Sequence, residues 1–150
     1  MDLILWRHAD AEDGIPDMQR RLTPKGRKQA QHVAAWLKQR LPGRYTLLAS
    51  PALRAQETAA ALGERVKTVQ SLAPGAAPRQ ILEAAGWPGR EGTVVVVGHQ
   101  PDLGRTAAWL VGAAQASWSV KKGGLWWIAS RTRDEADQVV VRAVMSPDLL

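Results

Sequence analysis

The feature that most constrains this chain is an uninterrupted run of five β-branched residues, Thr93 to Val97. Such a run favours a β-strand, and because no polar residue alternates within it, both faces of the strand should be buried. The run leads within two residues to His99, and an earlier apolar run, Leu3 to Trp6, leads directly to Arg7 and His8. Ligands of open α/β sheets bind beyond the carboxyl ends of the strands. We therefore expect a binding site where these two strands end.

A third strand, near residues 45–49, is expected to end at the same edge of the sheet. Ser50 and Pro51 follow it, and proline near the first helical position is typical of a helix start. Arg54 then falls in the first turn of that helix, where the backbone N–H groups and the helix dipole already favour an anion. The expected site is therefore one that binds an anion.

Strands alternate with helices along the chain, which predicts an α/β fold: a three-layer αβα sandwich with a mostly parallel central sheet. The predicted strands cover residues 2–7, 45–49, 66–69 and 93–97, with a C-terminal hairpin of 125–129 and 139–144 around a turn at 131–135. The predicted helices cover residues 24–41, 51–63, 79–85 and 102–111, and residues 9–22 form a polar loop. Five alanines of the second helix suit close packing on a sheet: Ala52, Ala55, Ala59, Ala60 and Ala61. A length of 150 residues fits one domain, residues 1–150.

Three motifs, in order along the chain, carry a resemblance to a known family. They are Arg7-His8-Ala9, Ser50-Pro51-x-x-Arg54-Ala55-x-x-Thr58-Ala59 and Val97-Gly98-His99. With them the chain resembles the histidine phosphatase superfamily, whose fold is phosphoglycerate-mutase-like. Further motifs are similar to those of its small phosphohistidine phosphatases: Arg20-x-Leu22-Thr23-x-x-Gly26, Gly98-His99-x-Pro101-Asp102-Leu103 and Lys122-Gly123-Gly124.

The resemblance implies roles for the charged residues of these motifs. His8 would be the nucleophile, and Arg7, Arg54 and His99 would hold the phosphoryl group. Phosphoryl transfer needs such a nucleophile and cations around the equatorial oxygens. A neutral imidazole can attack near neutral pH if a hydrogen bond holds one ring nitrogen so that the other faces phosphorus. Arginine is a permanently charged, planar donor, and a protonated His99 would add another.

Two further arginines lie in the loop before the first predicted helix. By resemblance Arg20 would also reach the phosphate, whereas Arg21 is more simply a solvated residue. Arg21 stands where the family often has proline, and Ala9 stands where glycine is commoner.

Other hydrolase chemistries fit the sequence less well. The histidines stand alone, without the clustered His and carboxylate spacing of a metallophosphatase. Neither a Gly-x-Ser-x-Gly nucleophile elbow nor a P-loop motif occurs in the sequence. We therefore expect no metal and no cofactor. A non-catalytic phosphate-binding module on the same fold remains an alternative.

The general acid is the least defined part of the expected site. Larger superfamily members that act on alkyl phosphates carry a carboxylate in an insertion after the second helix, and the corresponding segment is short in this sequence. Phosphohistidine needs less help, because protonation of its free ring nitrogen lets a neutral imidazole depart. We therefore expect phosphohistidine on a partner protein as the substrate, with a small-molecule phosphomonoesterase as the alternative. Glu64, Glu83 and Glu91 are candidates for the acid, but none of them lies in a recognisable acid motif. Asp10, Glu12 and Asp13 are further candidates, although a solvated acidic loop is the simpler explanation for each of them.

The formal charge of +6 is unevenly distributed, because residues 18–56 contain nine Lys and Arg and no Asp or Glu. Such a field attracts acidic partners. A solvated helix face explains it more simply, and no nucleic-acid-binding motif is present, so nucleic acid is not an expected partner. Without a run of about 18 apolar residues or a signal-peptide pattern, we expect no membrane association and a cytoplasmic location. The oligomeric state is left open, since all seven tryptophans could be core residues.

Overall fold

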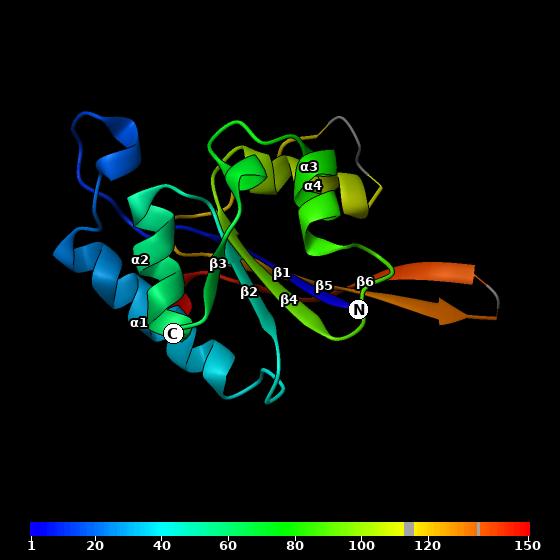
Figure 1. Ribbon diagram of the computed structural model, residues 1–150. Helices are drawn as coiled ribbons and strands as arrows, with labels where there is room; N and C mark the ends of the chain where they lie inside the picture. The colour runs from blue at the N-terminus through cyan, green and yellow to red at the C-terminus, as the bar shows by residue number, and fades with distance from the viewer. Residues whose placement is uncertain (113–115, 135) are drawn as a thin grey trace.

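The computed structural model describes residues 1–112, 116–134 and 136–150, which form a six-stranded sheet flanked by helices (Figure 1). The strand order is β3-β2-β4-β1-β5-β6. The strands are β1 (Asp2–Arg7), β2 (Thr46–Ala49), β3 (Val66–Thr68), β4 (Thr93–Gly98), β5 (Leu125–Arg133) and β6 (Ala136–Met145). The first four run parallel, while β5 is antiparallel to β1 and β6 is antiparallel to β5. The predicted α/β class and mostly parallel sheet are confirmed.

Helices cover both faces of this sheet. They are α1 (Pro24–Lys38), α2 (Leu53–Leu62), α3 (Pro78–Ala85) and α4 (Asp102–Leu110), with the short 3-10 helices η1 (Asp17–Gln19), η2 (Gln70–Leu72) and η3 (Pro147–Leu149). One core cluster joins the sheet to α1 and α2, and a second joins it to α3 and α4. The molecule is therefore the expected three-layer sandwich.

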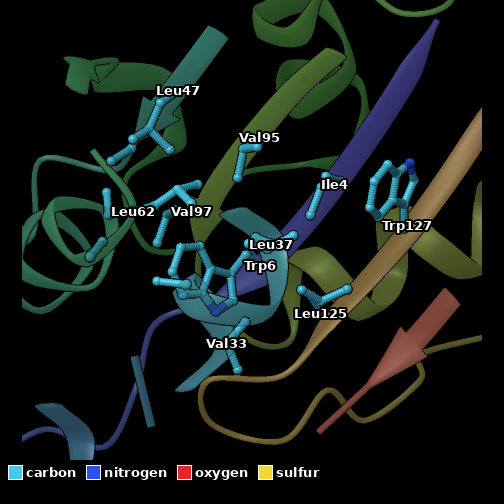
Figure 2. Packing of buried hydrophobic residues seen from close by; sticks show 14 residues of the cluster. Ile4, Trp6, Val33, Leu37, Leu47, Leu62, Val95, Val97, Leu125 and Trp127 are labelled. Carbon is cyan, nitrogen blue, oxygen red and sulfur yellow. The ribbon is translucent and has the colours of Figure 1, made fainter. Parts of the chain in front are cut away.

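Strand β1 shows why the sheet needs helices on both faces. Successive side chains of a strand point to opposite faces. Ile4 and Trp6 lie in the cluster with α1 and α2, where Figure 2 places Trp6 near Val33 and Leu37. Leu3 and Leu5 lie in the opposite cluster, with α3 and α4. All six residues of β4 are also buried, as the run of β-branched residues predicts.

Two helix predictions need correction. Helix α1 ends at Lys38 rather than at residue 41, because the backbone N–H groups of Arg40 and Leu41 both turn back to the carbonyl of Leu37. Leu41 still packs against the core from that turn, so the apolar periodicity runs beyond the helix itself. Helix α2 spans Leu53–Leu62 rather than residues 51–63. Ala60 is exposed, so this alanine does not pack on the sheet as expected.

The C-terminal hairpin is longer than predicted. Residues 131–133, expected in the turn, belong to β5 and pair with residues 136–138 of β6. This end of the hairpin is exposed, so its strands carry polar side chains that resemble a loop in sequence. Thr132 Oγ1, for example, donates to Asp137 Oδ1 across the strands at 2.9 Å. Glu135, also in the predicted turn, lies outside the described residues.

The loop at residues 9–22 is more ordered than the sequence predicts. It contains η1, and its two ends pair through an antiparallel bridge between Ala11 and Leu22. Helix α1 packs close against the loop, because a Cβ at Gly26 would collide with the carbonyl oxygen of Asp10. The loop is therefore held where β1 ends.

Backbone hydrogen bonds connect the residues that follow three of the strands. His8 N–H donates to Gly98 O and Ser50 N–H donates to Val97 O, each at 3.0 Å. The segments that follow β1, β2 and β4 therefore share one edge of the sheet, as expected. Among the described residues, no helix combines the length and the apolar character that crossing a membrane requires.

Candidate active site

A pocket of about 570 Å³, here called the strand-end pocket, opens beyond the carboxyl ends of β1 and β4. Its lining includes all five side chains that the sequence analysis expected to meet a phosphate: Arg7, His8, Arg20, Arg54 and His99. Arg21 is exposed and is not part of the lining. Arg7 and His99 are 92 positions apart in the chain, and the fold brings them together in one cavity.

His8 has a defined tautomer. Its Nδ1 lies 2.8 Å from the carbonyl oxygen of Ala9, which can only accept, so Nδ1 carries the proton. Its Nε2 lies 3.3 Å from Nε of Arg54, which can only donate, so Nε2 carries the lone pair. Burial, together with the charges of Arg54, Arg7 and Arg20, lowers the pKa of His8 to about 4, although the hydrogen bond to Ala9 raises it. His8 is therefore a neutral imidazole at pH 7, with its Nε2 lone pair facing the cationic side of the pocket.

His99 is anchored through Nε2, whereas His8 is anchored through Nδ1. Its Nδ1 lies 3.5 Å from Nη2 of Arg54, and its Nε2 lies 2.7 Å from Oγ of the fully buried Ser50. Because the guanidinium only donates, Nδ1 accepts and the Nε2–H donates to Ser50. Burial, followed by His8 and Arg54, lowers the pKa of His99 to about 3. Without a bound anion His99 is therefore neutral, and it needs a proton on Nδ1 before it can donate into the pocket.

Arg54 connects the two histidines and is itself held firmly. It is 4 % exposed, and besides its contacts to both imidazoles it donates from Nη1 to the Asp17 carbonyl at 2.8 Å and from Nη2 to the Asp17 carboxylate at 3.1 Å. Thr58, one turn along α2, accepts from the Ala9 N–H at 3.0 Å and donates to the carbonyl of Arg54 at 2.7 Å. The Arg54-x-x-x-Thr58 spacing therefore ties α2 to the backbone that follows His8.

Arg7 lines the pocket, and its guanidinium is only partly hydrogen-bonded. Its Nη1 donates to the carbonyl of Val120 at 2.8 Å, but its buried Nε has no acceptor within the described part of the chain. Burial also lowers the pKa of Arg7, the sign of a guanidinium removed from water without a compensating anion. No carboxylate of the described residues pairs with Arg7, so its charge is left to an anion bound in the pocket.

The acidic residues around the pocket are mostly engaged. Asp17 is paired with Arg20 at 3.0 Å as well as with Arg54, and Asp10 is paired with Lys122 at 2.7 Å. A hydrogen bond from Arg20 holds the pKa of Asp17 below its usual value, and one from Lys122 does the same for Asp10. Asp13 also lines the pocket and is exposed.

Asp102 was not singled out as a site residue by the sequence analysis. It is buried beside the pocket, and its Oδ2 accepts from the backbone N–H of Gly75 at 2.9 Å and of Ala76 at 3.1 Å. Burial raises the pKa of this carboxyl. Asp102 thereby ties the 74–76 loop, which forms part of the pocket wall, to the start of α4. The motif Gly98-His99-x-Pro101-Asp102-Leu103 is the sequence signal that contains Asp102, although the contacts of Asp102 to Gly75 and Ala76 cannot be inferred from it. Asp17 has no such signal, because its contact to Arg54 spans 37 residues.

The other candidate acids from the sequence lie away from the pocket. Glu64, Glu83 and Glu91 are absent from its lining, and Glu83 is paired with Arg79. No group of three or more His, Cys, Asp or Glu side chains suited to a metal ion occurs within residues 1–112, 116–134 and 136–150. The pocket thus combines a neutral imidazole with cationic donors, an arrangement suited to binding and attacking an anionic, electrophilic group.

Comparison with known proteins places this geometry in a family. Residues 3–76 match the model of the histidine phosphatase superfamily (branch 1). An uncharacterized protein of Picosynechococcus is 36% identical over 136 residues, which cover 83% of this chain and 82% of that protein.

Solved structures agree with this fold. The protein histidine phosphatase SixA complexed with tungstate has a TM-score of 0.82 and 24% identity, over 99% of both chains. A phosphoserine phosphatase from Entamoeba histolytica, solved with phosphoserine, has a TM-score of 0.73 and 17% identity, over 99% of this chain and 98% of that one. The chain thus belongs to the histidine phosphatase superfamily.

Proposed function

We propose that this protein is a metal-independent phosphatase that uses His8 as a covalent nucleophile. The observation that carries the proposal is the tautomer of His8. Its proton is held on Nδ1 by the Ala9 carbonyl, and its Nε2 lone pair is directed toward the guanidinium of Arg54. A non-catalytic phosphate-binding module would gain more from a protonated imidazole, because a cation binds the anion better. A neutral ring whose Nε2 keeps its lone pair can attack phosphorus, which a protonated imidazole cannot do.

The chemistry proceeds in two balanced steps. In the first, the Nε2 lone pair of His8 forms a bond to phosphorus, and the bond from phosphorus to the leaving group breaks with its electron pair. In the second, a water oxygen bonds to phosphorus, and the electron pair of the Nε2–phosphorus bond returns to His8 while the water proton passes to solvent. Arg7 and Arg54, with His99 once Nδ1 is protonated, bind the equatorial oxygens in both steps.

The substrate we propose is phosphohistidine on a partner protein. Its leaving group needs no dedicated acid, because a proton already on the free ring nitrogen allows a neutral imidazole to depart. Two carboxylates beside the pocket fit this, since the lowered pKa values of Asp10 and Asp17 make both of them poor proton donors at neutral pH. Asp102, whose pKa burial raises, is held through its Oδ2 by the backbone N–H groups of Gly75 and Ala76.

A small phosphate ester is the second candidate, and one observation favours it. Asp13 lines the strand-end pocket, so a carboxyl is within the cavity that a leaving alkoxide would enter. The volume of about 570 Å³ also falls in the range of small-molecule sites.

Rapid quench with ³²P-labelled substrate tests the proposed mechanism. We expect an acid-labile phosphoenzyme in the wild type that maps to His8, is absent in His8→Ala and forms equally well in excess EDTA. His32→Ala is the matched control, because His32 is the exposed histidine outside the pocket. A phosphoenzyme that persists in His8→Ala, or activity that EDTA abolishes, would contradict the mechanism.

A substrate panel tests the second part of the proposal. We expect kcat/KM to be much higher for a phosphohistidine protein than for alkyl, aryl and sugar phosphates. A preference for an alkyl or sugar phosphate that is lost in Asp13→Asn would instead identify the ester as substrate and Asp13 as its acid. Phosphate binding without turnover of any substrate would identify a binding module.

A further inference from the structure

Helix α4 begins directly after the active-site segment and is buried along most of its surface. Six of its residues are buried and Leu110 is half-buried, so only Arg105 and Trp109 are exposed within it. The two are four positions apart, which places them on the same side of the helix, about 6 Å apart along its axis. We call this pair the α4 stripe.

The α4 stripe starts inside the strand-end pocket. Arg105 lines that pocket together with His8, Arg54 and His99, and Trp109 lies one turn further along the helix. The stripe therefore runs from the pocket onto the surface around it. A ligand that fills the pocket and extends beyond it along α4 would meet these two side chains.

Arg105 differs from the other cations at the mouth of the pocket. Lys122 is paired with Asp10, and Arg20 is paired with Asp17. Arg105 makes no ion pair with any carboxylate of the described residues, although it lies close enough to Asp102 to lower the pKa of that carboxyl slightly. Its charge is thus available to a second anion, separate from the phosphoryl group.

Trp109 is 44 % exposed, and its side chain belongs to none of the three core clusters. An indole in this position leaves a large apolar surface in water. Trp and Arg are the residue types most enriched among those that dominate protein–protein binding energy. Their occurrence together beside the pocket favours a protein as the bound partner over a small molecule.

We propose that the α4 stripe docks the phosphorylated segment of a partner protein, with Arg105 pairing with an acidic side chain near the phosphorylated residue and Trp109 covering an apolar one. The inference rests on the proposed function and adds a sequence preference to it: acidic residues flanking the phosphohistidine. The stripe would then separate protein substrates from small phosphoryl compounds, which end inside the pocket.

Matched peptides test this preference. Phosphohistidine peptides with Glu at one flanking position are compared with the same peptides carrying Gln or Lys there, and phosphoramidate serves as the P–N substrate without a flanking chain. We expect the wild type to prefer the best Glu peptide over its Gln version by about fivefold in kcat/KM, the upper range of an exposed ion pair. Arg105→Ala should remove that preference through KM, and Arg105→Glu should reverse it in favour of Lys.

The controls separate docking from catalysis. Trp109→Ala should leave phosphoramidate turnover and the melting temperature unchanged, while it lowers kcat/KM for all three peptides. Because Arg105 lines the pocket, Arg105→Ala is judged by the ratio of Glu to Gln peptide turnover, and its loss on phosphoramidate should be smaller than its loss on the Glu peptide. Arg65→Ala removes an exposed arginine at the amino end of β3, opposite the pocket, and should change nothing.

Two results would overturn the docking inference: equal losses on Glu, Gln and Lys peptides in Arg105→Ala, or an equal loss on phosphoramidate. If His8→Ala is inactive while Arg105→Ala behaves as wild type on every substrate, the docking inference fails and the proposed function stands. If His8→Ala keeps its activity, the proposed function fails, and the docking inference that rests on it fails with it.

Discussion

His8 and His99 follow neighbouring parallel strands at the same register, yet their surroundings give them different chemistry. Arg7 pairs with Gly98 across β1 and β4, so the two histidines are equivalent by backbone position, and their ring centroids lie 5.2 Å apart. His8 is anchored through Nδ1 to a backbone carbonyl, and His99 through Nε2 to the hydroxyl of Ser50. One ring therefore presents Nε2 to the pocket and the other presents Nδ1.

The position of a histidine at the end of a strand therefore does not determine its role. Both rings are buried, neutral at pH 7 and within hydrogen-bond range of the same guanidinium. What separates them is the partner of the second ring nitrogen. In the proposed mechanism His8 is the nucleophile and His99 a donor to the phosphoryl oxygens, and four experiments examine that division.

The largest expected effect comes from His8→Ala. Removal of the nucleophile from a covalent mechanism leaves only the binding groups, so we expect kcat to fall by about 10⁴-fold or more. Steady-state turnover of a phosphohistidine protein measures this loss. Binding of tungstate, followed by calorimetry, should persist, because both arginines remain. A kcat within tenfold of wild type would assign the chemistry elsewhere.

His99→Ala should lower kcat less than His8→Ala does and should leave the covalent step in place. Loss of one donor to a developing charge typically lowers kcat by about 10²–10³-fold. The labelled phosphoenzyme on His8 should still form, more slowly, in a single-turnover quench. If the phosphoenzyme disappeared in a folded His99→Ala variant, the two histidines would act as one unit rather than as nucleophile and donor.

Stability in acid tests the neutral state that both rings share. Each folded-state pKa, about 4 for His8 and about 3 for His99, lies below the unfolded value of about 6.5. The unfolded chain therefore binds more protons below pH 6.5, and the two rings favour folding fully only above that pH. We expect the free energy of unfolding to fall by a few kcal/mol between pH 6.5 and pH 4, measured by urea titration.

The double variant His8→Asn/His99→Asn should have a flatter pH dependence over the same interval. Asp10 and Asp17, whose pKa values are lowered, lose their contribution at lower pH, below the ordinary aspartate value, and so do not mimic the effect near pH 5–6. An unchanged profile in the double variant would mean that the rings are not held neutral.

Ser50→Ala gives the smallest expected change and the most specific one. It removes the acceptor of the His99 Nε2–H, one neutral hydrogen bond, so kcat should fall by about tenfold or less. Nitrogen-15 NMR of the imidazoles should show His99 losing its single tautomer while His8 keeps Nδ1–H. A change at His8 alone would refute the assignment of Ser50 to His99.

The sequence was sufficient for the architecture and for five of the side chains that line the pocket, but not for Asp102 or Arg105. Thr93 to Val97 and Leu3 to Trp6 are buried strands because apolar runs without alternation need cover on both faces. In a parallel sheet the residues after such strands must share one edge, so the sequence alone groups Arg7, His8, Arg54 and His99. The position of the hairpin turn was harder to predict from sequence, because the exposed end of the β5–β6 hairpin is polar whether or not its residues pair.

The tertiary structure decided what each grouped residue can do. Which nitrogen of His8 or His99 carries the proton depends on a carbonyl or hydroxyl placed within about 3 Å of it, and no spacing in the chain encodes that distance. The same holds for Asp17, whose contacts to Arg20 and Arg54 lower its pKa. Electrostatic and hydrogen-bond energies change over single ångströms, whereas sequence patterns specify only faces and edges. Strand patterns and the family motifs therefore identify residues of the site, and packing determines their chemistry.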